Sequence, residues 1–148
     1  MGLGQTIDTT LFKRIEAAAQ DPDLYVDIAR LCTADDPSKA LNMYLRSLEI
    51  RLSQNQPGVP PQLLNNIGCL EYLKKDHQAA KAHFQQALIH TAQASDMDGQ
   101  EQDAALMTAT YNLAVVMEAL GEQGQAIQLY RQRILERHPE FMEGVYQY

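Results

Sequence analysis

The sequence predicts an all-α protein in which antiparallel helix pairs stack against one another. Apolar residues recur at spacings of three and four, as on one face of a helix, and strand-like alternation does not occur. Runs rich in Ala, Leu, Gln, Glu, Arg and Lys have favourable helix propensity. Three segments also repeat one order of features, namely an apolar helix with a small residue in it, a short polar turn and a second helix.

Composition narrows the class of protein further. Of the 148 residues, 45% are hydrophobic, which is enough to build a continuous core. The 19 acidic residues against 12 basic ones give a net charge of −7, which argues against direct binding of nucleic acid. The sequence shows no signal peptide and no apolar run near the roughly 18 residues of a membrane-spanning helix, so we expect a soluble protein without membrane contact.

Residues 1–22 are expected to hold one helix of an incomplete pair. Residues 1–10 give no clear signal and are left unassigned. Residues 11–20 read as the second helix of a preceding pair, and Asp21 with Pro22 ends it.

The first complete pair is expected over residues 23–57. Ala29 is the small residue of its first helix. Asp36 followed by Pro37 predicts the start of the second helix, because an N-cap acceptor then precedes a proline at the first helical position. Ala40 and Tyr44, four residues apart, share one face of that helix.

The second pair is expected over residues 60–95, with two prolines at its start. Gly68 is the small residue of its first helix, and Asp76 marks the turn. Ala80 and Phe84 repeat the spacing of four in the second helix. A side chain larger than a methyl group at these small positions would stop the two helices from approaching closely.

The third pair is expected over residues 104–138. Ala114 is its small residue, Gly121 marks its turn, and Ala126 and Tyr130 lie four apart in its second helix.

Two further segments flank this third pair. Residues 96–103 are acidic and polar, so we expect them to form a solvent-facing and partly helical connection. Residues 139–148 read as the truncated first helix of another pair. Because no second helix would cover Val145, Tyr146 and Tyr148, this segment predicts self-association or end-capping.

This order of features resembles the tetratricopeptide repeat (TPR), whose pattern has large-x-x-large-small in its first helix and Ala, an aromatic residue and a small residue in its second. The resemblance implies a right-handed superhelical solenoid. Two departures stand out: the small residues are spaced more widely than the about 34 residues of the regular repeat, and Arg133 takes a small-residue place. The residues expected to pack between helices are Ala29, Ala40, Tyr44, Gly68, Ala80, Phe84, Ala114, Ala126 and Tyr130.

Three strings, in this order and spacing, resemble a narrower group. VPPQLLNNIG, then TYNLA after a long connection, then ILERHP are similar to the TPR subunit of the polymerase-associated factor (Paf) complex. The resemblance implies a nuclear scaffold that binds other Paf-complex subunits through an extended or helical segment. It also implies an indirect link to RNA polymerase II, transcription elongation and co-transcriptional histone modification.

By analogy with the family, partners are expected in a groove lined by the first helices of the pairs. Its predicted residues are Gln62, Asn65, Cys69, Tyr72, Thr108, Tyr111, Val115 and Glu118. A second hypothesis is a peptide receptor or co-chaperone-like adaptor that grips the carboxylates at a partner's C-terminus. Such a grip needs Lys or Arg at these positions, and none of the eight is cationic.

Catalysis, cofactor binding and metal binding are not expected. The sequence contains no catalytic or phosphate-binding motif, so an enzyme hypothesis has no residues to assign. His83 and His90 lie seven apart, but no Cys, Asp or Glu completes a tetrahedral metal site at a sensible spacing. Cys32 and Cys69 are far apart without a CxxC motif, which favours free thiols in a reducing compartment.

Overall fold

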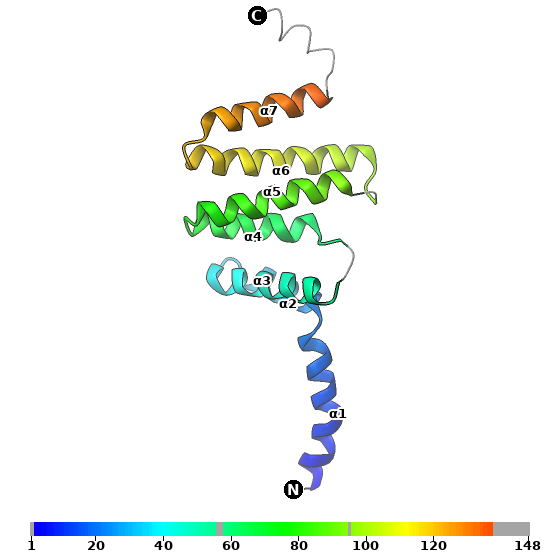
Figure 1. The fold of residues 1–148 in the computed structure, drawn as a ribbon. Helices are drawn as coiled ribbons and strands as arrows, with labels where there is room; N and C mark the ends of the chain where they lie inside the picture. Colours follow the sequence, from blue (N-terminus) through cyan, green and yellow to red (C-terminus); the bar gives the residue numbers. More distant parts are fainter. Residues whose placement is uncertain (1, 56–57, 95, 138–148) are drawn as a thin grey trace, which may run out of the picture. The chain divides into compact units, whose positions relative to one another are not determined.

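The computed structural model describes residues 2–55, 58–94 and 96–137, which form seven helices and no strand (Figure 1). The helices are α1 (Gly2–Ala19), α2 (Pro22–Cys32), α3 (Pro37–Ser53), α4 (Pro61–Leu73), α5 (His77–Gln93), α6 (Gly99–Ala119) and α7 (Gln123–Arg137). The predicted all-α fold is therefore confirmed. The chain divides into an N-terminal unit, residues 1–59, and a C-terminal unit, residues 60–148.

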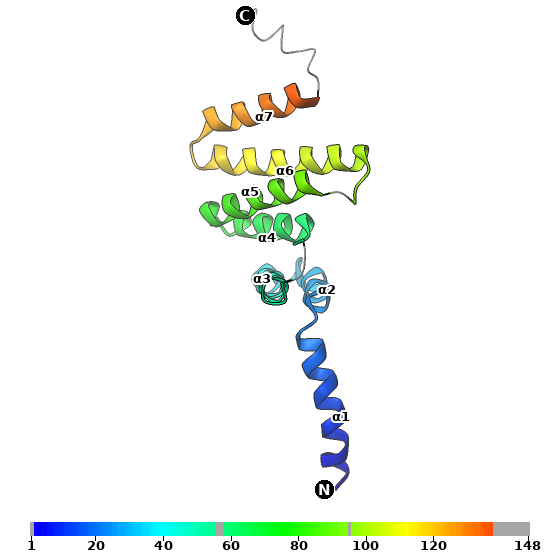
Figure 2. The same ribbon diagram turned by 45° about the vertical axis from the view of Figure 1, so that its right-hand side comes forward.

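The N-terminal unit consists of α1 and the pair formed by α2 and α3, which lie side by side in both ribbon views (Figures 1 and 2). Helix α1 begins at Gly2, whereas residues 1–10 had no assigned structure in the sequence interpretation. These residues show only a weak apolar pattern, and the helix forms nevertheless. They contain no proline, which would interrupt a helix.

Polar contacts join α2 to α3 inside this pair. The buried Ser47 donates its hydroxyl hydrogen to the carbonyl oxygen of Pro22 at 2.8 Å, and Arg51 pairs with Asp23 at 2.6 Å. Ala29 and Ala40 are fully buried. Asp21 and Asp36 accept hydrogen bonds from backbone amides in the first turns of the two helices, so each helix starts at an Asp-Pro step.

The C-terminal unit stacks four helices, with α4 against α5, α5 against α6, and α6 against α7 (Figure 1). Asp76 caps α5 through the amide of Ala79. Helices α4 and α6 end in the same way, because Lys75 and Gly121 adopt left-handed backbone angles of φ 65° and 79°. The amides that follow return to the last turn, for example from Glu122 to the carbonyl of Met117 at 2.8 Å.

The boundary predicted at residue 104 is wrong, because α6 already begins at Gly99. Asp98 caps this start by accepting from the amide of Glu101 at 2.8 Å. The side-chain amide of Gln102 then lies 3.2 Å from the carbonyl of Thr91 and 3.4 Å from that of Ala94. Most of residues 96–103 are exposed, as expected, but residues 99–103 form the first turn of α6, where Gln102 satisfies carbonyl groups at the end of α5.

Eight of the nine residues expected to pack between helices are buried, and Tyr130 is half-buried. In the C-terminal unit all of them except Gly68 belong to, or pack against, a cluster formed by α5, α6 and α7, and Tyr72 of α4 also packs against it. The buried members of this cluster are Ala80, Phe84, Leu113, Ala114, Val116, Met117 and Ala126. Arg133, which takes a small-residue place, lies alongside α6, and its Nε donates to the buried Thr110 hydroxyl at 3.3 Å.

Gly68 lies at a close contact between α4 and α5. A Cβ atom added there would lie 2.5 Å from Cε1 and 2.7 Å from Cδ1 of Phe84, which is closer than non-bonded carbons approach. Phe84 is itself 2% exposed and packed in the cluster, so its ring cannot simply swing away. The small residue is therefore required by the ring that it faces.

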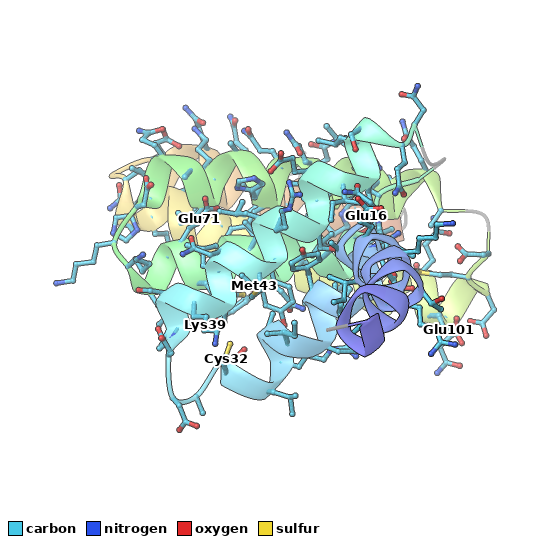
Figure 3. All side chains as sticks on the ribbon, turned by 90° about the horizontal axis from the view of Figure 1, so that it is seen from below. Glu16, Cys32, Lys39, Met43, Glu71 and Glu101 are labelled. Atoms are coloured by element: carbon cyan, nitrogen blue, oxygen red, sulfur yellow. The ribbon has the colours of Figure 1, made fainter. Side chains whose placement is uncertain are left out.

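A buried acid also joins α4 to α5. Glu71, labelled in Figure 3, is 7% exposed, and its Oε1 lies 2.5 Å from Nδ1 of His83. Burial raises the pKa of the Glu71 carboxyl, and the nearby Asp76 adds to this rise, while His83 opposes it. The pair therefore holds a carboxyl group that takes up a proton more readily than an exposed glutamate.

None of the helices in the described ranges is both long enough and apolar enough to cross a membrane. Cys32, at the end of α2 in Figure 3, and Cys69 are both free thiols.

Gly68→Ala is predicted to destabilise the protein by about 1–3 kcal/mol, because the new methyl group overlaps the Phe84 ring. Gly124→Ala is the matched control, since nothing lies within 4 Å of a Cβ added there. That change should be neutral or stabilising by at most about 1 kcal/mol. Chemical denaturation of the two variants measures both effects. Equal stability of the two variants would contradict the close contact.

Glu71→Gln is predicted to change how stability depends on pH. The pKa of Glu71 is higher in the folded protein than in the unfolded chain. At neutral pH the buried charge of Glu71 therefore lowers the free energy of unfolding. That cost is relieved as the pH falls towards about 4.3, the ordinary pKa of glutamate. Wild type should therefore gain stability relative to Glu71→Gln between pH 7 and pH 4.5. Glu118→Gln, at an exposed acid, controls for the loss of one charge. A constant difference between wild type and Glu71→Gln over that range would refute the prediction.

Candidate partner-binding face

The candidate site is formed by the outward sides of α4 and α6, which are the first helices, or A helices, of the second and third pairs. We call this surface the A-helix face. In both helices the buried residues lie on one side, and residues spaced three and four apart lie on the other. The two helices contact one another, and the side-chain amide of Asn112 on α6 lies 3.5 Å from the Asn65 amide oxygen on α4. The eight residues predicted for the groove all come from these two outward sides.

The α4 part of the face is polar. Gln62 and Cys69 are exposed, and Asn65 is half-buried. Gln62 donates from its side-chain amide to the Asn66 amide oxygen at 3.3 Å. Carboxamide groups both donate and accept hydrogen bonds, so this row can pair with the backbone of an extended chain. Although Cys69 is exposed overall, partial desolvation raises the pKa of its thiol, so the neutral form is favoured.

Tyr72 serves mainly as a packing residue. It is half-buried, it packs against the core cluster, and its ring centroid lies 5.1 Å from that of His77 with the planes tilted by 47°. Its ring is therefore largely in contact with other residues of the protein. Tyr72 belongs to the predicted groove set, but it offers a partner little contact area.

Tyr111 is the aromatic residue that the α6 part of the face exposes. Its exposed fraction is 59%, which is high for a large hydrophobic side chain. Thr108 and Glu118 on the same stripe are exposed, and Val115 between them is half-buried. The Thr108 hydroxyl donates to the carbonyl of Ala104 at 3.1 Å, so it is already engaged within α6.

Tyr130 on α7 is half-buried and packs against the core cluster, as expected of the aromatic residue of a second helix. Burial raises the pKa of the Tyr130 hydroxyl, and the Glu118 carboxylate and Tyr111 raise it further.

Two cations in the described part of this unit are paired with acidic side chains. Lys81 lies 2.8 Å and 3.0 Å from the two carboxylate oxygens of Glu122, and Arg133 pairs with Glu136 at 2.7 Å. Among the described residues, no group of three His, Cys, Asp or Glu side chains is arranged to hold a metal ion. The residues expected to drive self-association, Val145, Tyr146 and Tyr148, lie outside the described ranges.

Comparison with known proteins supports a TPR-like protein. The sequence is 26% identical over 143 residues to RNA polymerase-associated protein CTR9 of Caenorhabditis elegans, which covers 90% of this chain and 12% of that protein. It is 35% identical over 126 residues to Tetratricopeptide repeat protein 1 of Schizosaccharomyces pombe, which covers 84% of this chain and 11% of that protein. The chain thus spans a small part of the curated relatives it matches. No family model matches the sequence.

A solved structure has the same fold. The crystal structure of BtubC (BKLC) from P. vanneervenii matches 97% of this chain and 55% of that chain with a TM-score of 0.69. Because the two sequences are 19% identical, the likeness concerns the arrangement of helices alone.

The different burial of the two tyrosines predicts different effects of their removal. Tyr72→Ala should destabilise the protein by about 1–3 kcal/mol, because it removes a ring from the core and from His77. Tyr111→Ala should change stability by no more than about 0.5 kcal/mol, since most of the ring is exposed. Thermal unfolding of both variants measures the difference. A large loss of stability in Tyr111→Ala would show that its ring has a structural role.

Proposed function

We propose that this chain is part of a non-catalytic TPR scaffold that binds other subunits of the Paf complex in the nucleus. The complex would in turn support RNA polymerase II elongation and co-transcriptional histone modification. The similarity to RNA polymerase-associated protein CTR9 over 90% of this chain supports the proposal. The three strings that resemble the Paf-complex TPR subunit point to the same group.

The exposed Tyr111 is the single structural observation that supports a binding role for the A-helix face. Tyrosine provides a large, rigid contact area with a polar end, and such residues are enriched among those that dominate binding energy. The amides of Gln62 and Asn65 on α4 and of Asn112 on α6 can pair with a partner's backbone. An extended or helical segment of another subunit fits this combination.

The alternative, a receptor for an acidic C-terminal peptide, has less support. That receptor needs cations aimed at the partner's carboxylates. None of the eight face residues is cationic, and Lys81 and Arg133 are engaged by Glu122 and Glu136. An acidic peptide would also meet the carboxylate of Glu118 on the face.

Tyr111→Ala is predicted to weaken binding of a Paf-complex subunit at least tenfold, because it removes the main exposed contact of the face. The matched control is Ile89→Ala. Ile89 is 54% exposed on α5, the second helix of its pair, and does not belong to the A-helix face. This control should bind like wild type.

The measurement is titration of the purified 148-residue chain with each purified Paf-complex subunit, alongside thermal unfolding of the same samples. Unchanged affinity in a folded Tyr111→Ala would exclude the face as the binding surface. Binding of an acidic C-terminal peptide in place of any Paf-complex subunit would favour the receptor hypothesis.

A further inference from the structure

The N-terminal unit leaves two apolar stripes largely uncovered, one on α1 and one on α2. The α1 stripe consists of three exposed residues spaced four and three apart, namely Leu11, Ile15 and Ala18. The α2 stripe has the same spacing and consists of Leu24, Ile28 and Leu31. Leu31 is 84% exposed, the largest exposed fraction among the large hydrophobic side chains that the structure describes. Exposed apolar surface that is contiguous on one side of a helix marks an interaction site.

The two stripes complement one another when the helices run antiparallel. Because their spacing is the same, reversing one stripe against the other brings apolar residues opposite apolar residues. The facing pairs would be Leu11 with Leu31, Ile15 with Ile28, and Ala18 with Leu24. Ala18 is small, so it leaves room for the leucine that it would face. The shape and the apolar character of each stripe therefore suit the other.

Charged residues flank the stripes on matching sides. Arg14 lies on one edge of the α1 stripe, and Asp27 lies on the corresponding edge of the α2 stripe; both are exposed. Corresponding edges meet when two helices pack antiparallel, so the two charges would be neighbours of opposite sign. Among the described residues of this unit, the ion pairs join Arg46 to Glu49 and Arg51 to Asp23, and neither pair includes Arg14 or Asp27.

The connection between α1 and α2 keeps the two stripes of one chain apart. It consists of Gln20 and Asp21, and α1 extends away from α2 and α3 in both ribbon views (Figures 1 and 2). The Tyr25 hydroxyl donates to the carbonyl of Ala19 at 3.3 Å, and the side-chain amide of Gln54 donates to the carbonyl of Gln20 at 3.0 Å. Folding α1 back onto its own α2 would break these hydrogen bonds, whereas a second copy can supply its α1 with the bonds intact.

We propose that two copies of this chain exchange α1, so that the α1 stripe of each copy packs antiparallel on the α2 stripe of the other. The facing register is symmetric about Asp21, so one two-fold axis near that residue generates both contacts at once. The exchange covers both stripes of both copies and forms an Arg14–Asp27 ion pair at each contact. This inference does not depend on the proposed function, because α1 and α2 lie outside the A-helix face.

Leu31→Glu tests the interface, because Leu31 is exposed in the single chain and covered in the exchanged pair. Leu73→Glu is the matched control, since Leu73 is 70% exposed, ends α4 and belongs to neither stripe. Light scattering of the 148-residue chain over a range of concentrations measures the dissociation constant of the dimer, and thermal unfolding shows that each variant is folded. We expect Leu31→Glu to raise this constant about tenfold or more and Leu73→Glu to leave it within about twofold of wild type. A wild type that stays monomeric, or equal association of the two variants, would overturn the proposal.

Charge reversal shows whether the stripe that α1 covers belongs to a second chain. Arg14→Glu and Asp27→Arg should each associate about threefold or more weakly than wild type, because like charges then meet at both contacts. In a mixed dimer of the two variants, opposite charges meet again at both contacts, so we expect the mixture to associate within about twofold of wild type. If α1 folds back on its own α2, each variant keeps its like charges within one chain and mixing restores nothing. That result, or association that neither reversal weakens, would overturn the exchange.

Discussion

The close approach of α4 and α5 at Gly68 is the constraint on which the C-terminal unit depends. Phe84 fills the space where a methyl group on Gly68 would lie, and the same ring belongs to the cluster that includes Leu113 and Ala114 of α6. One aromatic side chain thus links its own helix pair to the next. Helix α6 in turn packs against α7, so the contact at Gly68 is connected to the rest of the unit through this cluster.

Much of the fold follows from the sequence because helix starts and small residues carry strong local signals. Asp21-Pro22 and Asp36-Pro37 begin helices as their chemistry requires, and Ala29, Ala40 and Gly68 are buried where the repeat pattern puts them. The start of α6 at Gly99 was not placed because residues 96–103 are mostly polar. Their helix is held by a cap and by the contact of Gln102 with α5, which has no periodic signature.

The candidate face was less predictable than the fold. Helical spacing identifies which residues of α4 and α6 point away from the core. It does not predict how much of each side chain is covered by neighbouring helices. Tyr72 and Tyr111 occupy similar stripes, yet His77 and the cluster cover the first and leave the second open. Tyr130, a residue typical of packing, does pack against the cluster but is only half-buried. Such differences arise from contacts between helices that are distant in sequence.

The link between Gln102 and the end of α5 fixes the number of residues between that contact and the A-helix face. Gln102 and Thr108 belong to one continuous helix, so each residue inserted between them turns Gln102 by about 100° and moves it by about 1.5 Å relative to the face. A change of one residue would turn its amide away from the Thr91 carbonyl. A change of seven residues would nearly restore the direction but move the amide by about 10.5 Å, which is too far for the hydrogen bond. This part of α6 therefore holds the face at one fixed distance from the end of α5.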